Sequence, residues 1–302
     1  MKSQSEKQLY DDGRVAASAS KPSRQQGDGF RSQPLLPHQM IHHIWRMREL
    51  VIQFTRRDIE TRYRDSVMGI LWTVANPLLM LAVYTFAFGL IFRSRWPQSR
   101  SQSLTEFALI IFCGITIFNL FSETVNRAPT LVINVPNFVK KVVFPLEILP
   151  ISALLTALFN MSISLCIVVL GNLLFAGSIP WTTVFIPLII LPVSLLSLGS
   201  AWFLASLGVF FRDIGPIIAV AVQALFFLTP IFYTPAAIPE PFRSALVFNP
   251  IADAVEQGRN ALLFGIAPDF ARLGLWIVIT SIVAILGYGW FMLTKKAFAD
   301  VV

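Results

Sequence analysis

Apolar residues along this chain lie in long runs that carry no charge, and each run is long enough to form a membrane-spanning helix. A helix that crosses a hydrocarbon layer of ~30 Å needs about 20 predominantly apolar residues. By this criterion the sequence predicts six spans, at about 69–92, 105–123, 148–172, 181–208, 214–234 and 273–294. Residues 148–211 carry no charge and are interpreted as two crossings, with the turn in a cluster of small and polar residues: Gly171, Asn172, Gly177, Ser178 and Pro180. The predicted fold class is an all-α integral membrane protein.

A segment that precedes the first span has an amphipathic pattern. In residues 41–65, Ile44, Met47, Val51 and Phe54 follow spacings of three and four, which predicts one helix with an apolar face. A second apolar set, Trp45, Ile52 and Ile59, repeats every seven residues. Basic polar residues line the other side, so we expect this interface helix to lie in the cytoplasmic headgroup layer. A water-soluble helix packed on a partner is the alternative.

The stretch between spans five and six, residues 236–271, is too polar and too broken by proline to span. It predicts two short re-entrant helices in the outer leaflet. One helical face would be apolar and another would be wet; the apolar set is Ile251, Val255, Gly258 and Leu262, and the wet set is Asp253, Glu256 and Arg259.

Composition agrees with a membrane protein. Of the 302 residues, 55% are hydrophobic and 14% are charged, whereas a soluble domain has roughly 45–50% and about 25%. This excludes an ordinary soluble enzyme. Residues 1–40 mix charges with Ser, Gly, Gln and Pro, which predicts a disordered cytoplasmic tail.

The net charge of +7 comes from Lys and Arg residues that flank the spans. Ten lie near span ends on the side of the termini, and six lie on the other side; the six are Arg93, Arg95, Arg100, Arg243, Arg259 and Arg272. The positive-inside rule therefore predicts that both termini are cytoplasmic. Because orientation explains the excess charge, no nucleic-acid partner is expected.

Several kinds of chemistry are missing from the sequence. It has no phosphate-binding glycine loop, and its three histidines all precede the spans. No Asp, Glu, Lys or Arg falls in the middle of a predicted span, whereas ion-coupled carriers place ionisable groups there. The interior amides Asn76, Asn119, Asn160, Asn172 and Gln223 are better explained by hydrogen bonds between helices than by substrate contact. No catalytic, cofactor or metal site is predicted, and Cys113 and Cys166 fall in apolar runs where no disulfide is implied.

Residues 126–147, between spans two and three, combine three prolines with a short apolar piece and the basic pair Lys140 and Lys141. A short helix that protrudes here could dock in a groove of a soluble partner. A solvated connecting loop is the alternative.

Several motifs in this order carry a family resemblance: RRDIETRYRDSVMGILWTVANP at 56–77, NVPNFVKKVVFPLEILP at 134–150, FRDI at 211–214, and TPIFY at 229–233 followed by NP at 249–250. Over about residues 45–300 the chain resembles the membrane subunits of type-2 ABC exporters for polysaccharides and polyol phosphates. Within that family it looks most like the Wzm-type permeases of O-antigen export.

The resemblance implies a transport subunit that is not itself an enzyme. Two copies would form a pore in the bacterial inner membrane, and two copies of a soluble ATPase would bind ATP and Mg below it. The resemblance assigns the coupling to the ATPase to Asn126, Arg127, Pro136, Asn137, Phe138, Lys140, Lys141, Arg212 and Asp213. It assigns the gate helix to 41–65, with Trp45, Arg56, Arg57, Asp58, Arg62, Tyr63 and Arg64. The short helices of 236–271 would line the exit.

A polymer that crosses a pore needs a lining that binds each sugar weakly, and flat aromatic faces supply this. Candidate lining residues in spans one, two and five are Trp72, Asn76, Tyr84, Phe118, Phe121, Phe226, Phe232 and Tyr233. Each aromatic taken alone is more often a packing or lipid-facing residue.

The expected cargo is a lipid-linked, O-antigen-like polysaccharide that moves from the cytoplasm across the inner membrane. The alternatives are a capsule or teichoic acid polymer, or a small hydrophobic molecule. A membrane enzyme that uses Asp253, Glu256 and Arg259 is a weaker hypothesis, because acid/base work needs paired carboxylates.

Overall fold

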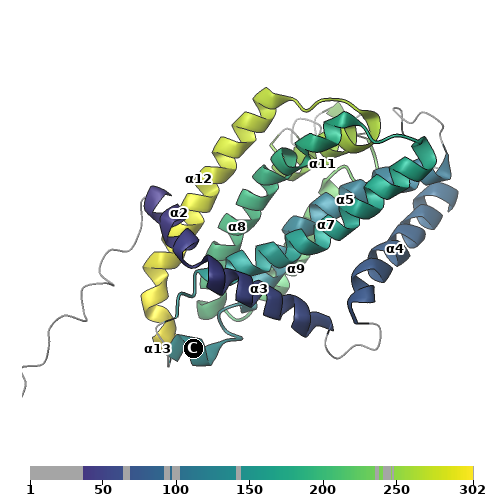
Figure 1. Cartoon of the computed structure of the whole chain (residues 1–302). Coiled ribbons are helices and arrows are strands. Elements are labelled where there is room, and N and C mark those ends of the chain that lie inside the picture. The colour runs from purple at the N-terminus through teal and green to yellow at the C-terminus, as the bar shows by residue number, and fades with distance from the viewer. Residues whose placement is uncertain are drawn as a thin grey trace, which may run out of the picture.

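The computed structural model describes residues 37–63, 69–91, 96, 103–140, 144–234, 238–240, 246 and 248–301, and these form helices and connecting turns without a strand (Figure 1). The all-helical prediction is thereby confirmed for the described residues. The predicted tail of 1–40 lies outside them except for residues 37–40, which begin the first described helix.

Four helices are long and apolar enough to cross a membrane: α5 (Leu104–Arg127), α7 (Ile148–Ala176), α8 (Ile186–Phe210, preceded by a 3-10 turn at Trp181–Phe185) and α12 (Phe270–Thr294). They coincide with the second, third, fourth and sixth predicted spans. Of the 18 most apolar consecutive residues of α5, 78% are buried, whereas 22% of those of α12 are buried. α5 is therefore the central helix, and α12 lies on the outside.

The other two predicted spans hold shorter helices. These are α4 (Trp72–Tyr84), which continues as a π-helix at Thr85–Ile91, and α9 (Ile214–Leu228). The 15 residues of α9 extend about 22 Å at 1.5 Å per residue, which is less than the ~30 Å of a hydrocarbon layer. Pro230 lies two residues after the end of α9, and Pro77 lies inside α4. Six full spans therefore remain a prediction.

The turn between α7 and α8 lies later than predicted. Gly171 and Asn172 are inside α7, which ends at Ala176. Gly177 caps the helix with φ of 71°, a left-handed conformation that glycine adopts without steric cost. Asn172 is buried, and its amide donates to the Leu262 and Ser178 carbonyls. This amide therefore joins elements of the fold, as its sequence context indicated.

Helices α8 and α12 cross closely at Gly199 of α8, a residue without a side chain. A Cβ added to Gly199 would lie 2.6 Å from the Val283 carbonyl oxygen and 2.7 Å from the Ala284 Cα. Glycine is the residue that lets two membrane helices approach this closely. The contact fixes the position of α12 against the bundle.

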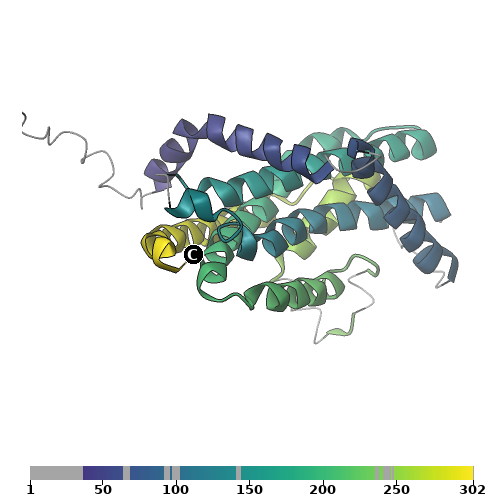
Figure 2. The same cartoon turned by 90° about the horizontal axis from the view of Figure 1, so that it is seen from below.

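The predicted helix of 41–65 is two helices, α2 (Pro37–Arg46) and α3 (Arg48–Tyr63), which are separated at Met47 and lie along one end of the bundle (Figure 2). Ile44, Met47, Val51 and Phe54 pack on the protein core, as their spacing predicted. Trp45 and Ile52 face away from that core, with 67% and 61% of their surface exposed. The two apolar sets thus serve different surfaces, and only the first one packs on the protein.

Between α9 and α12, the described residues form α11 (Pro250–Arg259) and a π-helical turn at Asn260–Phe264. The prediction of a wet face on this helix is wrong. Asp253 and Arg259 are buried at 9% and 3% exposure, and only Glu256 is exposed. The reason is that α11 packs between α5 and α8, where backbone carbonyls surround the Arg259 guanidinium.

Candidate functional site

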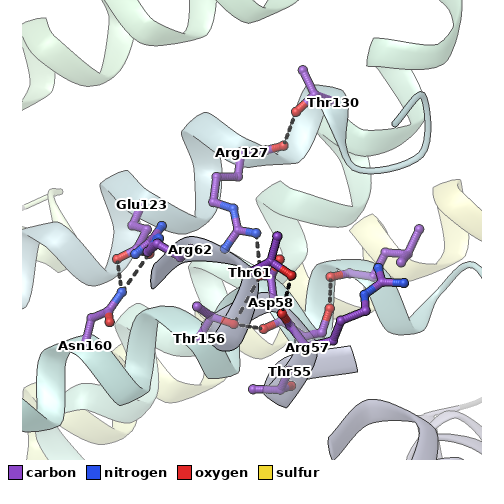
Figure 3. A network of polar contacts seen from close by, with 12 residues as sticks. Thr55, Arg57, Asp58, Thr61, Arg62, Glu123, Arg127, Thr130, Thr156 and Asn160 are labelled. Atoms are coloured by element: carbon purple, nitrogen blue, oxygen red, sulfur yellow. Dashed lines mark hydrogen bonds and ion pairs between the residues drawn. The ribbon is translucent and has the colours of Figure 1, made fainter. Parts of the chain in front are cut away.

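Helices α3, α5 and α7 each present two polar side chains four residues apart, and these six side chains meet in two clusters (Figure 3). Residues at this spacing lie on one face of a helix, one turn apart. We call the first cluster the 58 node; it contains Asp58, Arg127 and Thr156. The second, the 62 node, contains Arg62, Glu123 and Asn160.

In the 58 node, the Asp58 carboxylate of α3 accepts a hydrogen bond from the Arg127 guanidinium of α5. The Thr156 hydroxyl of α7 lies 3.3 Å from the same carboxylate oxygen. In the 62 node, Arg62 pairs with Glu123 at 2.7 Å. The Asn160 amide donates to both Glu123 oxygens, at 2.9 and 3.1 Å.

The charges of the two nodes are arranged in opposite order. The acid belongs to α3 in the 58 node and to α5 in the 62 node. If α3 slid along α5 by one turn, Asp58 would face Glu123 or Arg62 would face Arg127, and like charges repel at this distance. The nodes therefore specify a single register of α3 against α5.

Directly after Arg127, the chain forms a 3-10 turn at Ala128–Thr130 and the short helix α6 (Pro136–Lys140). Phe138 of α6, Phe144 and Phe54 of α3 form an aromatic cluster with ring centroids 4.8 to 5.8 Å apart. The Arg57 guanidinium lies over the Phe54 ring at 4.4 Å. The segment between α5 and α7 is therefore packed directly on α3.

Residues of this segment and of the turn between α8 and α9 are exposed and available to a partner. Pro136, Asn137, Arg212 and Asp213 are exposed. Asn126 is exposed as well and donates to Ser122. Arg64 and Lys141, which sequence reasoning also singled out, lie outside the described residues, and Tyr63 and Lys140 are the last residues of α3 and α6.

Glu147 anchors the other end of the segment, and sequence reasoning gave it no role. Its carboxylate is 2% exposed and contacts Lys295 at 2.6 Å and His43 at 2.9 Å, while its carbonyl accepts from the Trp202 indole at 3.0 Å. Burial raises the pKa of this carboxyl, but Lys295 and His43 outweigh burial and bring the pKa below its ordinary value. The segment is thus held at Arg127 on one side and at Glu147 on the other.

Comparison with known protein families shows to which family the chain belongs. Residues 49–263 match the family model described as the ABC-2 type transporter. The chain belongs to the ABC-2 type transporter family. The family resemblance predicted from the sequence is thereby confirmed.

Three relatives of this ABC-2 protein are named as export permeases or transport proteins. An O-antigen export system permease of Klebsiella pneumoniae is 25% identical over 84% of this chain and 95% of its own length. One of Myxococcus xanthus is 28% identical over 70% of this chain and 79% of its own length. A polysialic acid transport protein of Escherichia coli is 23% identical over 80% of this chain and 92% of its own length.

Most of the predicted channel-lining aromatics of this ABC-2 chain form a cluster. Phe226 of α9 packs on Phe118 of α5 at 5.1 Å and on Phe232 at 5.3 Å, and Tyr84 lies 5.4 Å from Phe232. Phe118, Phe121 and Phe232 are buried within the single chain, whereas Trp72 is 41% exposed and Asn76, Tyr84, Phe226 and Tyr233 are partly exposed. Within one copy, the first three residues are core residues.

The structural role of the buried Arg259 is a second feature that the sequence did not reveal. Its Nε, Nη1 and Nη2 atoms donate to the carbonyls of Ile110, Pro230 and Ile231, at 2.9, 2.7 and 2.7 Å. The Trp96 ring covers the guanidinium at 4.6 Å. One side chain therefore joins α11 to α5 and to the chain that follows α9. The position of Arg259 one turn after the apolar Val255, in a short proline-broken helix between two predicted spans, is the signal that could have identified it.

Proposed function

We propose that this ABC-2 chain is the membrane subunit of an ATP-driven exporter of a lipid-linked polysaccharide. Two copies would form the pore, two copies of a soluble ATPase would bind ATP and Mg, and both termini would face the cytoplasm of a bacterium, in its inner membrane. The similarity to O-antigen export permeases over most of both chains supports this cargo. The sequence contains no loop for nucleotide phosphates, so the energy must come from a partner.

The observation that carries the mechanism is the anchoring of the 128–147 segment at both of its ends: on α3 through Arg127 and the aromatic cluster, and on α2 through the contact of Glu147 with His43. Force that the ATPase applies to exposed Pro136 and Asn137 would reach Phe54 through the aromatic cluster and Asp58 through Arg127. α3 would then act as the gate helix, because Arg62 at its end lines the same cavity as Trp72 at the start of α4. Arg212 and Asp213 would provide a further contact with the ATPase.

The pore would use the exposed and partly exposed aromatics and amide of α4, of α9 and of the chain that follows α9, namely Trp72, Asn76, Tyr84, Phe226 and Tyr233. Flat rings bind successive sugars without trapping any one of them. The buried Phe118, Phe121 and Phe232 would support these residues from behind.

Reconstitution in vesicles with the partner ATPase tests the proposal. We expect export of the polysaccharide only with ATP, and we expect Lys140→Glu with Lys141→Glu to abolish export while the chain still inserts. Lys296→Glu, an exposed charge in the 3-10 turn after α12, is the matched control and should export normally. Polysaccharide transport by this chain alone along an ion gradient would refute the proposal.

A capsule polymer is the second candidate cargo, and the similarity to the polysialic acid transport protein supports it. Parallel assays with a neutral O-antigen glycan, an acidic capsule glycan, a teichoic acid polymer and hydrophobic drugs separate the alternatives. Stimulation of ATP hydrolysis by the drugs alone would favour a small-molecule efflux permease.

A further inference from the structure

A polar cleft lies between α4, α5 and α7, inside a single copy of the chain. Its volume is about 150 Å³, which leaves room for on the order of five water molecules at the ~30 Å³ that each occupies in the liquid. A second cavity of about 220 Å³ shares Asn76, Thr116, Asn119 and Ser164 with it and continues to Tyr84 and Phe226. The two form one groove that runs from the 62 node to the aromatic cluster.

Buried polar atoms line this cleft without partners. Among the described residues, the hydroxyls of Thr73 and Thr116 and the amide oxygen of Asn160 have no hydrogen bond, although these atoms are buried. Other threonine hydroxyls in the long helices, such as those of Thr124 and Thr280, donate to a carbonyl one turn back, whereas Thr85 and Thr183 also lack a partner within the part of the chain that the structure describes but do not line this cleft. An unpaired buried polar group costs about 1–3 kcal/mol, so three around one cavity need a ligand or water to explain them.

The charges of the cleft exclude most ionic ligands. Glu123 is the acid of the cleft, and it is already neutralised by Arg62 and bonded by Asn160. A metal cation would have to compete with Arg62, and a phosphate would have to lie beside the Glu123 carboxylate. A neutral ligand with several groups that both donate and accept hydrogen bonds meets neither obstacle.

We propose that this cleft binds a sugar ring of the transported polysaccharide through its hydroxyl groups. Each sugar hydroxyl can donate to the Asn160 oxygen or accept from a threonine, and each threonine can do both. Trp72 at the rim is 41% exposed and offers a flat apolar face. The inference rests on the proposed function, because that function supplies the sugar.

The cleft shares residues with the 62 node, so a bound sugar would affect the contacts that hold α3. Glu123 and Asn160 belong both to the cleft and to the 62 node. A sugar in the cleft therefore contacts the groups that hold the end of α3. Cargo binding and the position of the gate helix would share the same side chains.

The test uses the full transporter complex in lipid nanodiscs and vesicles, with variants Thr73→Val and Thr116→Val, which keep the side-chain shape and remove the hydroxyl. The probe is the lipid-free polysaccharide of the source strain, released by mild acid. We expect each variant to bind it about tenfold more weakly, the equivalent of one hydrogen bond of roughly 1.4 kcal/mol, and to export more slowly. Their thermal unfolding midpoints should be unchanged or higher, because an unpaired buried hydroxyl has been removed.

Two controls complete the test. Thr116→Ser retains a hydroxyl and should restore binding. Thr280→Val removes a buried hydroxyl that is bonded within α12 and should bind the probe normally. Wild-type affinity and export rate in both cleft variants would overturn the sugar site while leaving the proposed function intact. A wild-type complex that exports no polysaccharide with ATP would instead overturn the proposed function.

Discussion

Arg62 on α3 forms a 2.7 Å ion pair with Glu123 on α5, one helical turn beyond the pair of Asp58 with Arg127, in which the charges are exchanged between the two helices. Two such pairs act as a register, because each one is favourable only when α3 lies in one position. Each pair is completed by a polar side chain of α7, so the three helices are joined at the same two levels (Figure 3).

Exchanging the charges of the 62 node tests this register. Arg62→Glu alone should place two carboxylates together and reduce ATP-dependent export several-fold. Arg62→Glu combined with Glu123→Arg should recover much of the activity, because the Asn160 amide can rotate and present its unpartnered oxygen to the new arginine. Export by the double variant that is no better than that of Arg62→Glu would contradict the register. Arg48→Glu, whose contact with Glu49 lies within α3 and is exposed, is the control and should export normally.

Acidification should weaken the anchoring of Glu147. The folded pKa of this carboxyl is lowered, so its pairing stabilises the protein above the ordinary carboxyl pKa of about 4.3, and that stabilisation is lost as the pH falls through the folded pKa. Glu147→Gln should lower the thermal unfolding midpoint at pH 7 and flatten its dependence on acid pH. Glu49→Gln, at an exposed position, should leave the wild-type profile. If the thermal unfolding midpoint of Glu147→Gln depended on pH in the same way as that of wild type, this would argue against the ion pair.

The close crossing of α8 and α12 predicts that alanine substitutions at two glycines have different effects on stability. Gly199→Ala places a methyl group against the backbone of Val283 and Ala284 and should destabilise the protein by about 1–3 kcal/mol. Gly274→Ala, in α12, meets no atom within 4 Å and should be neutral or slightly stabilising. Denaturation of the purified protein in detergent measures both. Equal stability of the two variants would mean that the crossing can relax.

Removal of the buried guanidinium should be costly. Arg259→Met leaves the carbonyls of Pro230 and Ile231 without their present donors and should destabilise the fold, at about 1–3 kcal/mol for each buried acceptor left unsatisfied. Arg259→Lys keeps the charge, but a single ammonium cannot reproduce the three-way fork and should rescue only in part. The half-exposed Arg272→Met is the comparison and should cost about 1 kcal/mol or less. Wild-type unfolding of Arg259→Met would refute a role for this residue in joining α5, α9 and α11.

Much of the candidate site could be predicted from residue patterns. The apolar spacing of Ile44, Met47, Val51 and Phe54 identified the face of α2 and α3 that packs on the protein. The prolines and basic pair of 126–147 identified the segment that the structure anchors on α3. The nodes themselves could not be predicted, since Asp58, Glu123 and Asn160 come from three distant segments and no local pattern relates them.

Three structural details went against the pattern for identifiable reasons. Asp253 and Arg259 lie on the polar face of a short helix, yet that face is buried because α11 packs on α5 and α8, and α5 and the chain after α9 supply carbonyl partners to Arg259. Gly171 and Asn172 are common in turns, yet they continue α7 because Asn172 has a distant partner in Leu262. The helix of 41–65 is interrupted at Met47, which its continuous period did not indicate.

The sequence by itself determined that this protein is helical and lies in a membrane. The reason is that long uncharged apolar runs are a local feature of the chain, and such runs cross a bilayer as helices. It also determined the family, through motifs whose order along the chain is read directly. Only the tertiary structure decided which polar side chains meet, which charge is buried and where a polar cleft remains between α4, α5 and α7. Those features depend on the register of one helix against another, and register is set by the packing of residues far apart in the chain.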